Sequence, residues 1–334
     1  MLQKNKIPEV SVICPVYNQE KYIRRMLDGL LMQETTFPVE FLIHDDASPD
    51  STVAIIKEYV EKDPERFILS VEPTNTYALG IDYMPDLMTK APRGKYLAFC
   101  EGDDYFTDPH KLQKQYEAME AHPECSMCIH QVEGISEDET KRVRMFPDTP
   151  FPEGPVKAET IIHESLGKDY WLIHTTCFFI RKSYVDLAVE QNYDFLVNAC
   201  YTDQALVLLS AMNGDFYYID ACMTRYRFNS TGSTIQQSRI REKQKRNCLE
   251  LIRCMESFDQ ISQQKYHSDV EDYVGALHFS IANCELDFKK MLSKDMRKYL
   301  KRMRWYARLR VYISAVFPYF DTLYYKIRKY LQGV

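Results

Sequence analysis

Two pairs of carboxylates stand where this sequence could bind a ligand. Asp45-Asp46 and Asp103-Asp104 each follow a short apolar run that is typical of a buried strand. Parallel strands bring their carboxyl ends to one edge of a sheet. Carboxylates gathered there repel one another unless a cation or a donor-rich ligand lies between them. The spacing therefore predicts a site for such a ligand at this edge.

The elements that must position these pairs alternate between strands and helices. Strands are expected at residues 10–14, 41–43, 67–71 and 96–100. Helices are expected at residues 23–31, 53–60 and 81–89, and after the start signal Asp108-Pro109. This alternation predicts βαβ units, and hence an α/β fold with a mostly parallel sheet flanked by helices.

The pattern is looser after residue 122. Residues 136–155 are polar and contain prolines, so a loop is expected there. Strands are expected at 173–180 and 216–219, with a helix between them from Thr202 or Asp203 to Gly214. From about residue 239 the pattern is mainly helical, with a break near Pro318.

The charge of the 334-residue chain is unevenly distributed. Residues 289–334 contain thirteen Lys/Arg and two Asp/Glu, a net charge of +11, whereas the preceding residues carry a net charge of −17. An acidic body argues against a nucleic-acid enzyme, whose binding groove would be basic. The basic tail favours an anionic partner or a solvated surface.

No signal peptide is expected, because the N-terminal residues contain no apolar stretch. No run of about 18 apolar residues occurs either, so no membrane span is expected. The ten cysteines are ordinary for a reducing compartment. Cys125 and Cys128 form one CxxC without a second pair at zinc-site spacing, which favours burial in the core over metal or redox chemistry.

Four ordered motifs carry a family resemblance. They are SVICPVYN at 11–18, DDASPDST at 45–52, GKY at 94–96 followed by EGDDYF at 101–106, and Thr202-Asp203 ahead of TRYR at 224–227. Together they resemble the family 2 glycosyltransferases, which have the GT-A nucleotide-sugar fold, over residues 9–235. The resemblance implies a Rossmann-like GT-A domain at 1–238, with a nucleotide-binding half at about 1–122 and an acceptor half at about 123–238. A helical C-terminal region with a basic amphipathic tail would follow at 239–334.

The resemblance also implies roles on the donor side. Asp104 resembles the direct ligand of a divalent metal, Mg²⁺ or Mn²⁺, and Asp103 a second metal-binding carboxylate that lies nearer the ribose or sugar. A hard cation held by carboxylates and phosphate oxygens would neutralise the leaving diphosphate. Pro15, Tyr17 and Asp46 resemble the nucleotide contacts, with the Tyr17 ring stacked on a pyrimidine. Packing at the strand end is the alternative for Tyr17.

The resemblance implies roles for four further residues. Asp203 resembles the catalytic base of inverting members, and its alternative role is to stabilise the start of a helix. Arg227 would either clamp phosphate oxygens or pair with an acidic residue, and the His that many relatives have two positions later is Asn229 here. Trp171 and His174 precede a strand that faces the acceptor in this family, although core packing is equally consistent with Trp171.

Three other residues have simpler expected roles. Asp45 is expected to make turn hydrogen bonds, and Asp50 and Ser51 are expected to cap the next helix.

Single-sugar transfer is expected, because the QxxRW signature of processive synthases is missing. The resemblance implies a bacterial polysaccharide or glycan type of enzyme. It would move one sugar from a nucleotide sugar, a UDP-sugar, to a saccharide or polyprenyl-linked saccharide. Two alternatives are a sugar nucleotidyltransferase and a non-catalytic sugar-binding protein associated with a membrane. The nucleotidyltransferase would need a Gly-rich basic loop after the first strand, where residues 17–20 have none.

The basic tail alternates apolar and cationic residues, with Trp305 among the apolar ones. This pattern favours an interfacial helix on an anionic membrane leaflet, and so a cytoplasmic protein held peripherally at the inner face of the membrane. A helix that packs its apolar face on the acidic body is the alternative.

Overall fold

One mixed sheet organises the described part of the chain. The computed structural model describes residues 7–167, 172–228, 241–317 and 320. Within them ten strands pair, eight of them in the order β3-β2-β1-β4-β9-β6-β10-β5, while β7 lies on β6 and β8 on β10. The first four are parallel, as predicted: β1 (Val10–Val16), β2 (Val39–Asp45), β3 (Phe67–Val71) and β4 (Tyr96–Phe99).

The second half of the sheet mixes directions. β9 (Phe179–Arg181) runs antiparallel between β4 and β6 (Cys125–Ile135). β6 pairs in parallel with the long strand β10 (Asp215–Arg227). The remaining strands are antiparallel additions: β5 (Tyr105–Phe106), β7 (Arg142–Phe146) and β8 (Gly154–Val156). The C-terminal end of β10 therefore reaches β5, which directly follows Asp103-Asp104.

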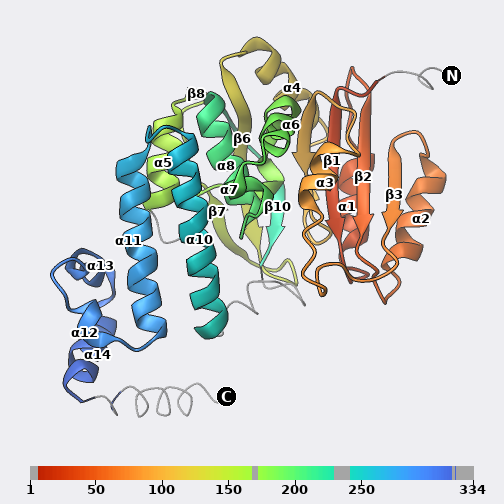
Figure 1. Cartoon of the computed structure of the whole chain (residues 1–334). Coiled ribbons are helices and arrows are strands. Elements are labelled where there is room, and N and C mark those ends of the chain that lie inside the picture. Colours follow the sequence, from red (N-terminus) through yellow and green to blue (C-terminus); the bar gives the residue numbers. More distant parts are fainter. Residues whose placement is uncertain (1–6, 168–171, 229–240, 318–319, 321–334) are drawn as a thin grey trace.

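Helices cover both faces of the sheet (Figure 1). Alternate residues of β1 point to opposite faces, so Val12 and Cys14 enter one buried cluster and Ile13 the other. The first cluster is closed by α1 (Ile23–Leu31), α2 (Thr52–Lys62) and α4 (Lys111–Ala121). The second is closed by α3 (Met84–Thr89), α5 (Ala158–Gly167), α6 (Lys182–Glu190), α7 (Asp194–Val197) and α8 (Thr202–Asn213).

The C-terminal helices lie at the opposite end of the molecule from β3 (Figure 1). α10 (Arg241–Ile261) and α11 (His267–Cys284) form a hairpin whose Met255, Phe258 and Val270 enter the second cluster. A small cluster of its own holds α12 (Phe288–Met291), α13 (Arg297–Arg302) and α14 (Trp305–Val316) against α11. This confirms the helical C-terminal region, while the boundary at residue 238 stays a prediction. None of the described helices combines the length and apolarity needed to cross a bilayer.

Several local expectations were wrong. The expected loop 136–155 contains β7 and β8, and the expected strand 173–180 begins with the 3₁₀ turn Thr175–Cys177 before β9. The helix expected from residue 81 starts at Met84, and that after Asp108 starts at Lys111. β6 was not predicted, because buried polar residues such as His130 interrupt its apolar pattern. Cross-strand pairing rather than local pattern decides these segments.

The CxxC cysteines are part of the core, as favoured by the sequence. Cys125 and Cys128 lie on β6, and both are fully buried among apolar side chains. Burial raises the pKa of both thiols, so neither is a reactive thiolate.

The packing of Phe258 generates a test of whether the C-terminal hairpin is integral to the fold. Its buried ring meets Phe195 edge-on and stacks on Tyr266, each at 5.6 Å between ring centroids. We expect Phe258→Ala to lower the free energy of unfolding by about 3–5 kcal/mol, because it leaves a cavity in the core. Leu249→Ala, at a half-exposed position of the same helix, serves as the control. Urea denaturation measures the free energy of unfolding of both variants. Equal and small decreases in the two variants would show that the hairpin is peripheral to the fold.

Candidate active site

Backbone hydrogen bonds tie together the loops that follow β1, β2 and β4. The Asp46 N–H donates to the Val16 carbonyl at 3.0 Å, and the Gly102 N–H donates to the Pro15 carbonyl at 3.3 Å. The end of β1 therefore lies between the two acidic loops. This confirms the predicted convergence of strand ends and places Pro15 at its centre.

Asp104 is buried at the end of this edge. Its Oδ1 accepts a hydrogen bond from the Arg227 backbone N–H at 3.0 Å, while its Oδ2 has no hydrogen-bond partner in the described structure. Burial and the charges of Asp103 and Glu101 raise the pKa of Asp104 well above its ordinary value. A buried carboxylate oxygen without a donor is suited to a cation.

Asp103 and Glu101 complete this acidic group. Burial and the charges of Asp103 and Asp203 raise the pKa of Glu101 to about 8. Within the described residues, no three His, Cys, Asp or Glu side chains are grouped so that they could hold an ion by themselves. The residues present therefore fit a cation whose coordination is completed by oxygens of a ligand, which is how Mg²⁺ is commonly bound beside phosphates.

His174 lies beside Asp104. Its Nδ1 is 3.9 Å from Asp104 Oδ2, and its ring packs on Tyr226 with 3.8 Å between centroids. Burial lowers the pKa of His174 to about 3, so the imidazole is neutral. The Thr176 N–H donates to Nδ1 at 3.4 Å, which leaves the proton of the neutral ring on Nε2. Its acceptor role stays a prediction, and Trp171 and Asn229 lie outside the described residues.

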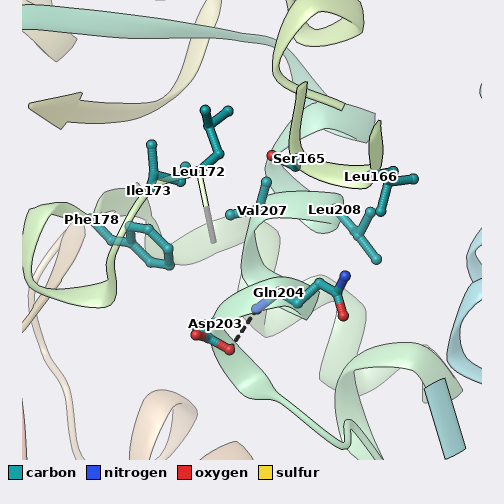
Figure 2. Close-up of a pocket in the computed structure, with 9 residues that line it drawn as sticks. All are labelled: Ser165, Leu166, Leu172, Ile173, Phe178, Asp203, Gln204, Val207 and Leu208. Atoms are coloured by element: carbon teal, nitrogen blue, oxygen red, sulfur yellow. Dashed lines mark hydrogen bonds between the residues drawn. The ribbon is translucent and has the colours of Figure 1, made fainter. Parts of the chain in front are cut away.

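Asp203 occupies the first turn of α8, as predicted from the helix pattern. Its Oδ1 accepts from the Gln204 backbone N–H at 2.8 Å. It borders a cavity of about 30 Å³, which has room for about one water molecule. Figure 2 shows the largely apolar lining, which includes Leu172, Ile173 and Phe178.

The surroundings of Asp203 raise the pKa of its carboxyl group. The dipole of α8 favours the ionised form of a carboxylate at the helix start and would lower its pKa. Instead burial, which outweighs the backbone hydrogen bonds, raises the pKa of Asp203 to about 6. The side chain is still partly accessible, and it is ionised near neutral pH. Such a carboxylate can accept a proton from a nearby hydroxyl.

Tyr17 and Asp46 differ in accessibility. Tyr17 is 45% exposed at the end of β1, so it is not the packed aromatic that was the alternative. Asp46 is buried, and its carboxylate accepts hydrogen bonds from the backbone N–H groups of Thr76 and Tyr77 at 2.7 and 3.0 Å. Although burial raises the pKa of Asp46, the bonds from Thr76 and Tyr77 outweigh it and leave the pKa below its ordinary value. Its contact with a nucleobase stays a prediction.

The guanidinium of Arg227 is held by protein groups. It donates to the Asp103 carbonyl at 3.2 Å, to the Glu137 carbonyl at 2.6 Å and to Glu139 Oε1 at 2.7 Å. It also lies over the ring of Tyr22, 4.6 Å from the centroid. The pairing with an acidic residue is thus the alternative that is observed.

Asp45 and Asp50 behave as expected, whereas the expected capping by the Ser51 side chain was wrong. Asp45 accepts from the backbone N–H and the hydroxyl of Ser48 at 2.9 and 2.6 Å. Asp50 accepts from the Thr52 N–H at 3.0 Å at the start of α2, whereas the Ser51 side chain makes no capping bond. These contacts shape the loops beside the site.

Sequence reasoning missed three contributors. Glu101 stood inside a motif without a role, and Glu137 and Glu139 lay in the expected loop. Neither glutamate has a local pattern that links it to Arg227, which is about 90 residues away. No sequence signal could have found this contact without pairing information.

Comparison with known sequences gives one family. The profile described as Glycosyl transferase family 2 matches residues 11–187, more than half of the chain. An uncharacterized protein of Mycobacterium tuberculosis is 35% identical over 223 residues, which are 67% of this chain and 60% of that protein. The matched region therefore spans less than two thirds of this relative's own length.

Solved structures share the fold. Staphylococcus aureus TarS 1–349 in complex with UDP-GlcNAc superposes with a TM-score of 0.56 at 18% identity, covering 97% of this chain and 92% of that one. The Pyrobaculum calidifontis mannosyltransferase PcManGT in complex with GDP-Man and Mn²⁺ has a TM-score of 0.51 at 14% identity. It covers 92% of this chain and 86% of that one.

The family match includes the strand ends that carry Pro15, Asp46 and Asp103-Asp104, which the structure brings to one edge. It agrees with the resemblance expected from the motifs. The chain belongs to glycosyl transferase family 2.

Proposed function

We propose that this chain is an inverting glycosyltransferase that moves one sugar from a nucleotide sugar to a hydroxyl of a saccharide or lipid-linked saccharide. The observation that carries the proposal is electrostatic. Asp203 comes from α8 and Glu101 from the loop after β4, yet the charge of Asp203 raises the pKa of Glu101. The candidate base is thus close enough to the strand-end carboxylates to interact with them electrostatically, which supports the proposal.

Asp203 is the proposed base. An acceptor hydroxyl must lose a proton as it attacks the anomeric carbon, and a single displacement inverts that carbon. With a pKa of about 6, Asp203 is basic enough to take this proton and is still ionised at neutral pH.

Asp104 and Asp103 are the proposed holders of a divalent cation, Mg²⁺ or Mn²⁺. When bound, such a cation supplies charge neutralisation for a leaving nucleoside diphosphate. The unpartnered Oδ2 of Asp104 fits this role, and the Arg227 backbone N–H keeps Oδ1 in place. We assign the guanidinium of Arg227 to positioning, because Glu139 and two carbonyls already hold it.

A UDP-sugar is the proposed donor. The exposed ring of Tyr17 offers a face for a pyrimidine. Pro15 lies two residues earlier on β1, and Asp46, whose N–H donates to the Val16 carbonyl, lies in the loop after β2. The fold shared with TarS, which was solved with UDP-GlcNAc, supports this donor class.

The first prediction concerns the base. We expect Asp203→Asn to keep donor binding and to lower turnover by ~100-fold or more, because the amide cannot take the proton. The pKa of about 6 adds a pH signature: wild-type kcat/KM should rise as pH increases through 6 and then level off. Below that pH the carboxyl is protonated and inactive, and the variant should lack this rise. Donor affinity, turnover and the pH dependence of kcat/KM are measured on one preparation of each protein. Turnover of Asp203→Asn near that of the wild type would show that Asp203 only stabilises the helix start.

The second prediction concerns the cation. Asp104→Asn keeps an oxygen that can accept from Arg227 but removes the charge. We expect it to weaken Mn²⁺-dependent UDP binding by ~10-fold or more. Isothermal titration calorimetry with and without EDTA measures this. Asp86→Asn, at an exposed ion pair with Lys90, is the control. If EDTA did not change UDP binding by the wild-type protein, a metal-binding role of Asp104 would be contradicted.

The third prediction concerns a peripheral location on an anionic membrane at the cytoplasmic face. One side of α14 presents Trp305, Leu309, Tyr312 and Val316, which are 70, 49, 53 and 70% exposed at helical spacing. Apolar insertion together with roughly 1 kcal/mol per nearby Lys or Arg would hold such a helix on anionic lipid.

We expect Trp305→Ser/Val316→Ser to abolish flotation with anionic liposomes at low salt, with Leu187→Ser, exposed on α6, as the control. Wild-type protein that does not float would show that the tail is a packing element. Beyond residue 317, only Phe320 is among the described residues.

A further inference from the structure

An open cavity of about 320 Å³, lined by polar and apolar groups, lies between α10 and α11. Its wall on α10 includes Gln244, Asn247 and Cys248, and its wall on α11 includes Ser280, Asn283 and Cys284. In both helices these positions have the spacing i, i+3, i+4, so each set lies on one side of its helix. Gln244 and Ser280 are exposed, and Asn283 Oδ1 accepts a hydrogen bond from Arg310 Nη2 of α14 at 2.6 Å.

The rest of the hairpin interface is different. Leu251, Ile252, Leu277 and Ile281 form an apolar cluster between the same two helices. Facing sides of paired helices are normally apolar, because their burial is what stabilises the pair. At the cavity the two helices instead present polar side chains that are exposed or half-buried, so hydrogen-bonding groups there are open to a ligand.

The chemistry of the lining selects a kind of ligand. Amide and hydroxyl side chains both donate and accept hydrogen bonds, and none of the described residues that line the cavity is charged. The nearby Lys245 and Glu285 neutralise each other across the two helices at 2.7 Å. Leu251 and Tyr201 add apolar and aromatic surface. This combination suits a neutral molecule rich in hydroxyl groups.

The cavity also adjoins the proposed base. Tyr201, which lines it, directly precedes α8 and stands two residues before Asp203. Asn247 Nδ2 donates to the Tyr201 hydroxyl at 2.9 Å, and Gln204 Nε2 donates to the Tyr273 hydroxyl at 3.3 Å. Burial first, and then neighbours that include Asp203, raise the pKa of both tyrosines. The wall of the cavity is therefore connected to the first turn of α8.

We propose that this cavity is a subsite for a neutral saccharide unit of the acceptor. The proposal rests on the proposed function, since it gives that reaction's acceptor a place to bind. It assigns acceptor recognition to the C-terminal hairpin as well as to the loops around the sheet edge.

Binding is tested first, without catalysis. Fluorescently labelled full-length protein is applied to an array of neutral and acidic oligosaccharides. The neutral oligosaccharide with the strongest signal is then added during N-ethylmaleimide labelling, which mass spectrometry follows at each cysteine. We expect slower labelling of Cys248 and Cys284, with Cys222, an exposed thiol on β10, as the internal control. The proposal would be overturned if no neutral oligosaccharide bound, or if acidic glycans bound more strongly. It would also be overturned if the bound oligosaccharide slowed the labelling of neither Cys248 nor Cys284.

A matched pair of substitutions tests the location. Ser280→Trp places an indole at the cavity, whereas His278→Trp places it at an exposed position two residues earlier, about half a turn away around α11. We expect Ser280→Trp to weaken saccharide binding by ~10-fold or more and His278→Trp to leave it unchanged. Equal affinities of the two folded variants would overturn the location.

Hydrolysis of UDP-sugars by the same proteins separates this proposal from the proposed function. Ser280→Trp should hydrolyse the donor like wild type, because water needs no acceptor subsite. A wild-type protein that binds saccharide but neither hydrolyses nor transfers any nucleotide sugar would refute the proposed function alone. If Ser280→Trp lost both UDP-sugar hydrolysis and saccharide binding, the cavity would be shown to support the fold rather than to bind an acceptor.

Discussion

The buried carboxylate of Asp104 is the constraint around which the site is arranged. One of its oxygens accepts a backbone hydrogen bond, and the other has no hydrogen-bond partner in the described structure. Desolvation and two neighbouring acids oppose its charge, so the group favours either a proton or a cation. A structural role alone would not need an acid at this position. The energetic cost of keeping Asp104 therefore points to a ligand with positive charge.

The long strand β10 makes this arrangement possible. Its last residue, Arg227, donates its N–H to Asp104 while its side chain reaches the Glu137 carbonyl and Glu139. A turn after β6 and a loop after β4 are thereby joined through one buried guanidinium. Because each nitrogen of that group has a defined acceptor, the clamp is directional and holds the acidic loop in one place.

Asp203 reaches the same site from the other half of the chain, at the start of α8. Its raised pKa follows from apolar neighbours such as Ile173 and Phe178, which belong to the segment around β9. The hairpin α10–α11 packs its far end into the same core through Phe258 and keeps its polar cavity next to Tyr201. The proposed donor-side acids, the proposed base and the proposed acceptor subsite are thus positioned by three separate segments around one sheet.

The sequence by itself determined the parallel strands β1 to β4, the helices between them and the acids at their carboxyl ends. These features depend on local periodicity and on motifs that stand directly after each strand. It also determined the helix that begins at Thr202. Tertiary structure alone decided that His174 lies beside Asp104, that Glu139 holds Arg227 and that Asp203 is desolvated.

Tertiary structure also decided β6, β7 and β8, because these strands form by pairing with partners such as β10 rather than from a hydrophobic pattern of their own. The physical reason is the same in each case. A hydrogen bond, an ion pair or a desolvation depends on groups that are distant in the chain, and no spacing within a local segment encodes which of them will meet.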